Sequence, residues 1–268
     1  MNHLFRDLAP VTDAAWAQIE DEATRSLRHF LAGRKLIDMT GPHGWDHSAV
    51  DLHRIAALES PIVGTEAAVR RVLPLIEVRI PFALKLSELA AADRGADDLD
   101  LDAVVEAARL AAVAEDGAIF HGFEPAGIEG LGGASPHDPV DISDDYDEYP
   151  SHVAKAVAVL RAAGVDGPYA IALGPRCYTG VVESTEHGGY PVFEHIKMIL
   201  GGPIIWAPAV NGAVVLSQRG GDAEVVIGQD FAIGYRGTTG DEVNLYLEES
   251  FTFKISSPEA AVALTYPA

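Results

Sequence analysis

Three histidines near the N-terminus are the first residues whose spacing could support chemistry. His43 and His47 are four residues apart, and His53 follows. Two histidines at positions i and i+4 of a helix can bind one metal ion. Pro42 and Gly44 indicate a turn instead of a helix, however, so we expect ordinary loop histidines and no metal site.

Two further patterns resemble binding motifs without completing them. Gly130-Leu131-Gly132 resembles the start of a dinucleotide-binding fingerprint, but position 135 is serine where the third glycine is needed. An acidic run could bind a hard cation, although it lacks the spacing of an EF-hand loop. The run consists of Asp144, Asp145, Asp147 and Glu148. We interpret it as a solvated loop, and we expect no bound cofactor and no metal.

Cys177 is the only cysteine and a candidate nucleophile. A catalytic thiol needs a positioned histidine, and His187 and His195 are near Cys177 in sequence only. The signatures of P-loop proteins, zinc metalloproteases and α/β-hydrolases are absent from the sequence. A serine triad is defined by geometry, so it stays open at this point. We name no catalytic residue and expect a protein that is not an enzyme.

The elements that would hold these residues belong to a large, acidic chain. Its 268 residues include 40 acidic and 19 basic side chains, which gives a net charge of −21. Free nucleic acid is therefore a poor partner, because binding it needs clustered lysines and arginines. The single cysteine excludes an internal disulfide and fits a reducing cytoplasm. We see no signal peptide or membrane-spanning stretch, and we expect a cytoplasmic protein without a membrane partner.

Apolar residues that recur every three or four positions predict helices over 13–32, 99–115, 151–163 and 191–200. Thr12 is the expected N-cap of the first helix, and Gly33 its expected stop. Asp98 or Asp100 would cap the second helix, and Gly117 would follow its end.

Short apolar runs predict strands over 169–173, 204–207, 213–217, 224–227, 243–247 and 251–255. Residues 178–190 are expected to form a loop. Residues 36–85 look extended, and Pro74 and Pro81 restrict them to an edge strand or an arm. We expect a projecting hairpin that packs on another copy of the chain. Helices and strands mix without a regular βαβ repeat, which predicts the α+β class.

Long collinear stretches of the chain resemble the encapsulin shell proteins, also called the linocin or bacteriocin-type family. They include LAPVTDAAWAQIEDEA near the start, GPHGWDHSAVDL at 41–52, LPLIEVRIPFALKLSEL at 73–89 and IFHGFEPAGIEGL at 119–131. The agreement continues through 166–173, 214–235 and 251–264. The resemblance implies the fold of tailed-phage major capsid proteins, which has a peripheral domain, an axial domain and an extended loop.

The expected division of the chain follows from this resemblance. It assigns 1–35 to an N-terminal helical arm, 36–90 to the extended loop region, 91–134 and 226–268 to the peripheral domain, and 135–225 to the axial domain. Family members assemble into closed icosahedral nanocompartments, which require about sixty copies or a multiple of sixty. The shell encloses a cargo enzyme, often a dye-decolourising peroxidase or a ferritin-like iron oxidase.

The resemblance also implies two sites. A C-terminal targeting peptide of the cargo would dock between the N-terminal helix and the C-terminal strands. The candidate residues are Phe30, Arg34, Asp38, Phe231 and Ile233, of which the apolar ones could equally be core residues. A pore loop would surround an opening for small solutes, or the same segment would be a flexible surface loop. Its residues are Glu183, Ser184, Thr185, Glu186, His187, Gly188, Gly189 and Tyr190.

Some members are reported to carry a flavin stacked on an aromatic residue. Position 87 is serine, which offers no stacking face, so we expect no flavin. Two other functions compete with the shell. One is a bacteriocin or protease-like enzyme, and the other is a phage major capsid protein. A capsid that packages DNA usually needs basic patches, and the net charge of −21 speaks against it.

Overall fold

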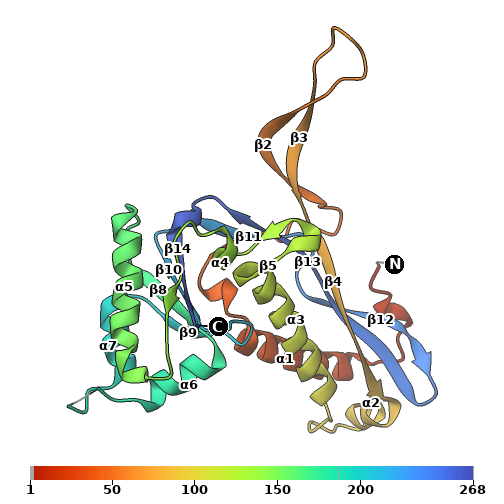
Figure 1. Ribbon diagram of the computed structural model, residues 1–268. Helices are drawn as coiled ribbons and strands as arrows, with labels where there is room; N and C mark the ends of the chain where they lie inside the picture. Colours follow the sequence, from red (N-terminus) through yellow and green to blue (C-terminus); the bar gives the residue numbers. More distant parts are fainter. Residues whose placement is uncertain (1–2, 187, 268) are drawn as a thin grey trace.

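Two mixed sheets, several helices and one long projecting hairpin make up the computed structural model, which describes residues 3–186 and 188–267 (Figure 1). The mixture confirms the predicted α+β class. The helices are α1 (Asp13–Phe30), α2 (Leu86–Asp93), α3 (Asp102–Phe120), α4 (Leu131–Ala134), α5 (Tyr149–Ala162), α6 (Pro175–Glu183) and α7 (Val192–Leu200). No helix in the described part of the chain combines the length and the apolar character needed to cross a bilayer.

The first sheet has a long central strand with neighbours on both sides. Its strands are β1 (Asp38–Thr40), β4 (Ile76–Lys85), β11 (Ala223–Ile227), β12 (Ala232–Thr239) and β13 (Glu242–Ile255). β13 pairs with β4 along one edge and with β12 and β11 along the other. Pro81 therefore lies in an edge strand, as predicted. Helices α1 and α3 pack on one face of this sheet and bury residues such as Leu245 and Leu247.

The second sheet is buried on both faces. Its order is β7 (Val140–Asp141), β14 (Ala261–Thr265), β10 (Ala213–Ser217), β8 (Tyr169–Leu173) and β9 (Ile204–Trp206). Helices α5 and α7 cover one face, and Ile171 and Leu173 point into that layer. On the other face Ala170 and Ala172 join the cluster of Phe120 and Phe251. This double burial explains why the whole of β8 is apolar.

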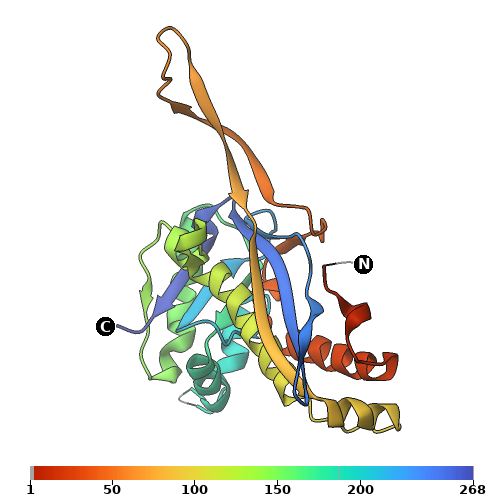
Figure 2. The ribbon, with the colours of Figure 1, turned by 90° about the vertical axis from the view of Figure 1, so that its right-hand side faces the viewer.

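The predicted arm is a two-stranded hairpin that leaves the body. β2 (Ala49–Leu58) and β3 (Ala67–Pro74) pair only with each other, and Figures 1 and 2 show them projecting well beyond the two sheets. The pairing shifts by a bulge between Asp51 and Arg54, where His53 has a φ of 55°. A two-stranded hairpin is marginally stable on its own in water. The arm therefore depends on contacts outside its own two strands.

The ends of the two long helices show what sequence reasoning read correctly and where it was wrong. The Thr12 hydroxyl accepts a hydrogen bond from the Ala15 N–H (3.4 Å), so the predicted N-cap of α1 is confirmed. In α3, neither Asp98 nor Asp100 is the N-cap, because the helix begins at Asp102 after Leu101. The helix also continues through Gly117 to Phe120. The buried side chains of its last turn hold it in the core.

Other predicted boundaries need correction in the C-terminal half. The expected loop over 178–190 is helix as far as Glu183, because α6 begins at Pro175 and buries Cys177 and Val181. The two expected strands at 243–247 and 251–255 are one continuous strand, β13. Sequence reasoning missed several strands. They are β12, which forms a hairpin with β13, β14, which pairs with the distant β10, and the short pair β5 (Gly122–Phe123) with β6 (Ile128–Glu129).

Candidate functional site

A groove lies beside the C-terminal half of α1. It has a volume of about 440 Å³. Leu27, Leu31 and Phe231 give it an apolar surface, and Arg28 and Lys35 lie at its sides. Leu27 and Leu31 follow each other on one face of the helix because they are four residues apart. The segment around Phe231, directly before β12, closes the opposite side.

Arg34 joins this groove to the interior of the protein. Its Nε lies 3.0 and 2.9 Å from the two carboxylate oxygens of Glu115, and its Nη1 donates to Asp230 Oδ1 at 2.9 Å. Its Nη2 donates to Glu249. The guanidinium carbon also lies 4.7 Å from the centre of the Phe231 ring, a cation–π contact. The arginine thus holds the wall of the groove in place.

Two of the three carboxyl groups around Arg34 are almost completely buried. The side chains of Glu115 and Glu249 are 0% and 2% exposed. Burial, together with the neighbouring charge of Glu115, raises the pKa of Glu249 well above its ordinary value. Buried charges of like sign are costly unless they are paired or protonated. The positive charge of the Arg34 guanidinium therefore offsets the repulsion and the desolvation cost of these buried carboxyl groups.

Asp116 fixes the turn that follows α1. Its two carboxylate oxygens accept hydrogen bonds from the backbone N–H groups of Ala32 and Gly33, each at 2.8 Å. Burial raises the pKa of Asp116 to about 7. A Cβ at Gly33 would lie 2.4 Å from Ile119 Cδ1, so any larger residue there would require the Ile119 side chain to shift. Helix α3, which carries Asp116 and Ile119, thus positions the turn that leads from α1 to the groove.

The five residues predicted for the groove occupy four places. Arg34 and Phe231 line it, whereas Ile233 lies behind it in the core and is 4% exposed. Phe30 is half-buried and packs toward Trp206, with ring centres 6.1 Å apart. Asp38 accepts a hydrogen bond from the Gly221 N–H (2.6 Å) in the turn before β11.

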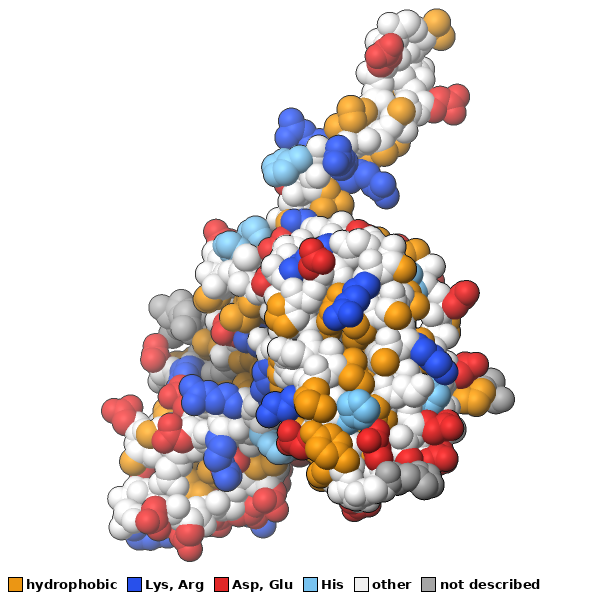
Figure 3. All heavy atoms as spheres, turned by 90° about the vertical axis from the view of Figure 1, so that its left-hand side faces the viewer, with side chains coloured by type: hydrophobic (Ala, Val, Ile, Leu, Met, Phe, Trp, Pro, Cys, Tyr) orange, Lys and Arg blue, Asp and Glu red, His pale blue; other side chains and the backbone are white. Residues whose placement is uncertain are grey.

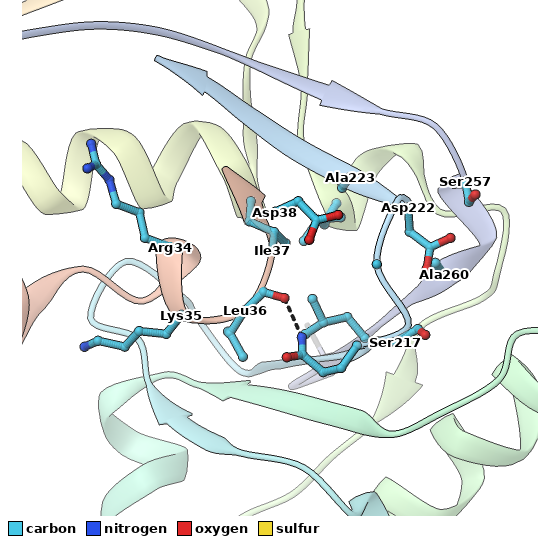
Figure 4. Close-up of a pocket in the computed structure, with 14 residues that line it drawn as sticks. Arg34, Lys35, Leu36, Ile37, Asp38, Ser217, Asp222, Ala223, Ser257 and Ala260 are labelled. Carbon is cyan, nitrogen blue, oxygen red and sulfur yellow. Dashed lines mark hydrogen bonds between the residues drawn. The ribbon is translucent and has the colours of Figure 1, made fainter. Parts of the chain in front are cut away.

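Asp38 lines a different, smaller cavity of about 130 Å³ where the two sheets meet. Figure 4 shows the Asp38 carboxylate and the Arg34 guanidinium pointing in different directions within this region. Sequence reasoning missed Leu27, Leu31 and Arg28 as lining residues. The helical spacing was visible, but it gave no indication that part of the apolar face stays open.

The predicted pore loop is a short, internally bonded hairpin after α6. The Glu186 N–H donates to the Tyr190 carbonyl, and the Gly189 N–H donates to the Glu186 carbonyl, both at 2.8 Å. Thr185 forms a bridge to Pro191. The Glu186 carboxylate lies 2.7 Å from Nδ1 of His195 on α7, so it is already paired within the chain. His187 lies outside the described residues.

The residues that first suggested chemistry are separated in the structure. Cys177 is fully buried, and its sulfur contacts the hydroxyls of Tyr149 (2.7 Å) and Tyr266 (3.2 Å). His195, the described one of its two candidate partners, faces Glu186 instead. The rings of His43 and His47 lie 4.8 Å apart before the arm, while His53 is on the arm itself. No potential metal-ligand cluster of three occurs within 3–186 and 188–267.

The other candidate motifs form ordinary local structure. The Gly130-Leu131-Gly132 segment opens α4, a helix of four residues. Asp144 forms an ion pair with Arg176, and the rest of the acidic run precedes α5. Ser87 is in the first turn of α2. These features position helices and turns, and they assemble no reaction centre.

Comparison with known proteins gives consistent matches along the chain. Residues 1–252 match the Linocin_M18 family, described as an encapsulating protein for peroxidase. A type 1 encapsulin shell protein of Rhodospirillum rubrum is 52% identical over 98% of this chain and 96% of its own length. One from Mycolicibacterium paratuberculosis is 46% identical over 99% of this chain and 100% of its own length.

The fold agrees with these sequence matches. The structure of a virus-like particle from Pyrococcus furiosus superposes with a TM-score of 0.66 at 17% identity, covering 92% of this chain and 98% of the other. That particle subunit establishes the capsid-like fold expected for the chain. Taken with the groove, the projecting hairpin and the family match over most of the sequence, this likeness leads to one assignment: the chain belongs to the family of encapsulin shell proteins.

Proposed function

We propose that about sixty copies of this chain, or a multiple of sixty, assemble into a closed icosahedral shell in the cytoplasm. The observation that carries this proposal is the arm. Ile55 is 73% exposed and Val63 is 103% exposed, and no residue in β2 or β3 is buried. A hairpin with this much exposed apolar surface gains stability when another copy covers it.

A shortened arm tests the assembly directly. We would replace residues 52–72 with a short glycine turn and examine both proteins by negative-stain electron microscopy. The full chain should give hollow particles, and the shortened chain should give none while it keeps its far-ultraviolet circular dichroism. Identical particles from the shortened chain, or the absence of particles from the full chain, would contradict the proposal.

We propose that the groove of Leu27, Leu31 and Phe231 binds the C-terminal targeting peptide of a cargo enzyme. Its volume of about 440 Å³ and its apolar surface suit a short extended segment with small and apolar side chains. The family description names peroxidase, which favours a dye-decolourising peroxidase over a ferritin-like iron oxidase. Of the predicted residues, Arg34 would hold the groove wall and Phe231 would contact the peptide.

Co-expression with a tagged reporter tests this role. The reporter would carry the C-terminal segment of the cargo enzyme encoded beside the shell gene. Phe231→Ala should reduce the reporter retained per particle at least about tenfold. Truncating an aromatic residue at the centre of an interface commonly costs about 2 kcal/mol of binding free energy. Phe123→Ala, at a 46% exposed phenylalanine outside the groove, is the matched control and should retain it. Equal loss from both variants would overturn the assignment.

The loop over 183–190 is proposed to surround a pore at a symmetry axis. Its position at the end of α6, with Tyr190 exposed and Glu186 facing His195, supports a loop held by its own hydrogen bonds. Replacing Gly188 and Gly189 (φ 122° and 82°) with alanine would strain the loop and should change the entry rate of a small dye. An unchanged entry rate would favour the plain surface loop.

The domain division and the absence of catalysis belong to the same proposal. The first sheet with α1 and α3 would form the peripheral domain, and the second sheet with α5, α6 and α7 the axial domain. In this proposal β11 would belong to the peripheral domain, because it pairs with β1 and β13 in the first sheet, and β14 to the axial domain, because it pairs with β10 in the second. The buried Cys177 supports a shell subunit that is not an enzyme.

A further inference from the structure

The arm carries three arginines that the rest of its own chain does not neutralise. Arg54, Arg70 and Arg71 are exposed, and none of them forms an ion pair within 3–186 and 188–267. The strand register places Arg54 directly opposite Arg71. Arg70 pairs with Ile55 and starts on the other face of the hairpin, and it lines one small cavity together with Arg54. Figure 3 shows basic side chains gathered on the arm above a body that exposes many acidic ones.

This placement costs the isolated chain stability. Like charges directly opposite each other on paired strands repel. The net charge of the whole chain is −21, so three exposed arginines close together on one hairpin contrast with the acidic balance of the rest of the chain. The acidic residues of the distal arm, Glu59 and Glu66, lie beyond the last pair of the hairpin, Leu58 with Ala67. On the proximal half of the arm, Asp51 lines the same small cavity as Arg54 and Arg70. The three arginines outnumber this carboxylate, and we call them the basic step of the arm.

A surface of opposite charge lies at the end of the molecule away from the arm. The segment from the end of α2 to the start of α3 exposes five aspartates, with Arg94 as its one basic residue. They are Asp93, Asp97, Asp98, Asp100 and Asp102. Figures 1 and 2 both place this segment at the end of the body away from the arm. The arm of one chain thus cannot reach the acidic segment of the same chain.

We propose that the basic step formed by Arg54, Arg70 and Arg71 binds the acidic segment 93–102 of a second copy of this chain. The complementary charges lie at opposite ends, so the contact is head-to-tail, and head-to-tail contacts can repeat until they close. The second acidic region, 138–148, is less suitable because Arg176 already pairs with Asp144. The inference rests on the proposed assembly and names the pair of surfaces that guides it.

Charge exchange between the two surfaces provides the test. The arm variant is Arg54→Glu with Arg71→Glu, which keeps a like-charge pair across the hairpin and reverses its sign. The segment variant is Asp97→Lys with Asp98→Lys. Each should raise the protein concentration needed for half-assembly at least about tenfold at physiological salt, because opposed like charges suppress association. The chain that carries all four changes should assemble near the wild-type concentration.

Controls separate the possible failures. Arg25→Glu with Arg109→Glu changes the net charge as much as the arm variant does, and should assemble like the wild type. Wild-type chains that never assemble would overturn the proposed shell itself. An arm variant that assembles normally, or a four-change chain without rescue, would overturn only the pairing of these surfaces. So would 260-nm absorbance in wild-type particles that the arm variant loses, because nucleic acid would then be the partner of the arginines.

Discussion

The arm and the body of this chain differ in where their stability comes from. All five residues of β8 are buried, and three apolar clusters connect the helices with both sheets. The eighteen residues of β2 and β3 form the two strands of the arm, and none of them is buried. The body can therefore fold on its own chain, whereas in the proposed shell the arm would be completed by a neighbour. A closed shell needs both properties in the same subunit.

The largest expected difference between the two regions concerns apolar truncation. Phe251→Ala removes a fully buried ring from β13 and should lower the free energy of unfolding by about 4 kcal/mol, measured by urea titration. Ile55→Ala on the arm should change that free energy by less than about 0.5 kcal/mol. It should instead weaken assembly. Similar losses of folding stability in both variants would show that the arm is part of the folded core.

A second contrast compares two arginines at the groove. Arg34→Leu leaves the buried Glu115 and Glu249 without their cation and should cost about 3 kcal/mol of folding stability. Arg28→Leu, in the same groove but without an ion pair in the described chain, should cost less than about 0.5 kcal/mol. Thermal unfolding of both variants checks the difference. Equal effects would mean that the carboxyl cluster does not need Arg34.

The pH dependence of the body provides a third measurement. The pKa of Asp116 is about 7 in the folded chain, above its ordinary value of 3.8, because of burial. The folded state therefore holds a proton that the unfolded state has released between these pH values. This contribution is complete below pH 3.8 and is lost as the pH rises from there through 7, by about 3 kcal/mol from pH 5 to pH 8. Asp116→Asn should flatten that part of the curve, and an unchanged curve would contradict it.

The smallest expected effect is at the start of α1. Thr12→Ala removes the hydroxyl that accepts from the Ala15 N–H and should cost about 1 kcal/mol. Thr12→Ser keeps the acceptor and should cost much less. Thermal unfolding of the two variants measures the difference, which would vanish if the cap contributed nothing.

Much of the arm could be predicted because its sequence is locally unusual. Pro74 and Pro81 within extended apolar runs exclude a central strand, so an edge or an arm remained. Local signals also predicted α1 with its cap, α7 and β8. They could not predict β12, in which Gly234 lies under the Tyr246 ring. A glycine weakens the sequence pattern of a strand. The reason for glycine at this position is the Tyr246 ring on the paired strand β13, which sequence alone does not place there.

The groove could be predicted only in part, because its parts are distant in sequence. Arg34 meets Glu115, Asp230 and Glu249, which are 81, 196 and 215 residues away. The spacing of apolar residues along the sequence carries no information about pairs of charged residues this far apart. The resemblance to a family indicated the helix and the strands beside the groove, and two of the residues that it selected for peptide binding, Arg34 and Phe231, line the groove. It also selected Asp38, whose carboxylate lies outside the groove and accepts a hydrogen bond from the Gly221 N–H.

The mass of the native particle tests the central claim most directly. Light scattering on the purified chain in mild buffer should give roughly 1.7 MDa, or a multiple, for about sixty chains of 28.4 kDa. A mass of one or two chains under the same conditions would contradict the account, because the arm would then be stable without a neighbour.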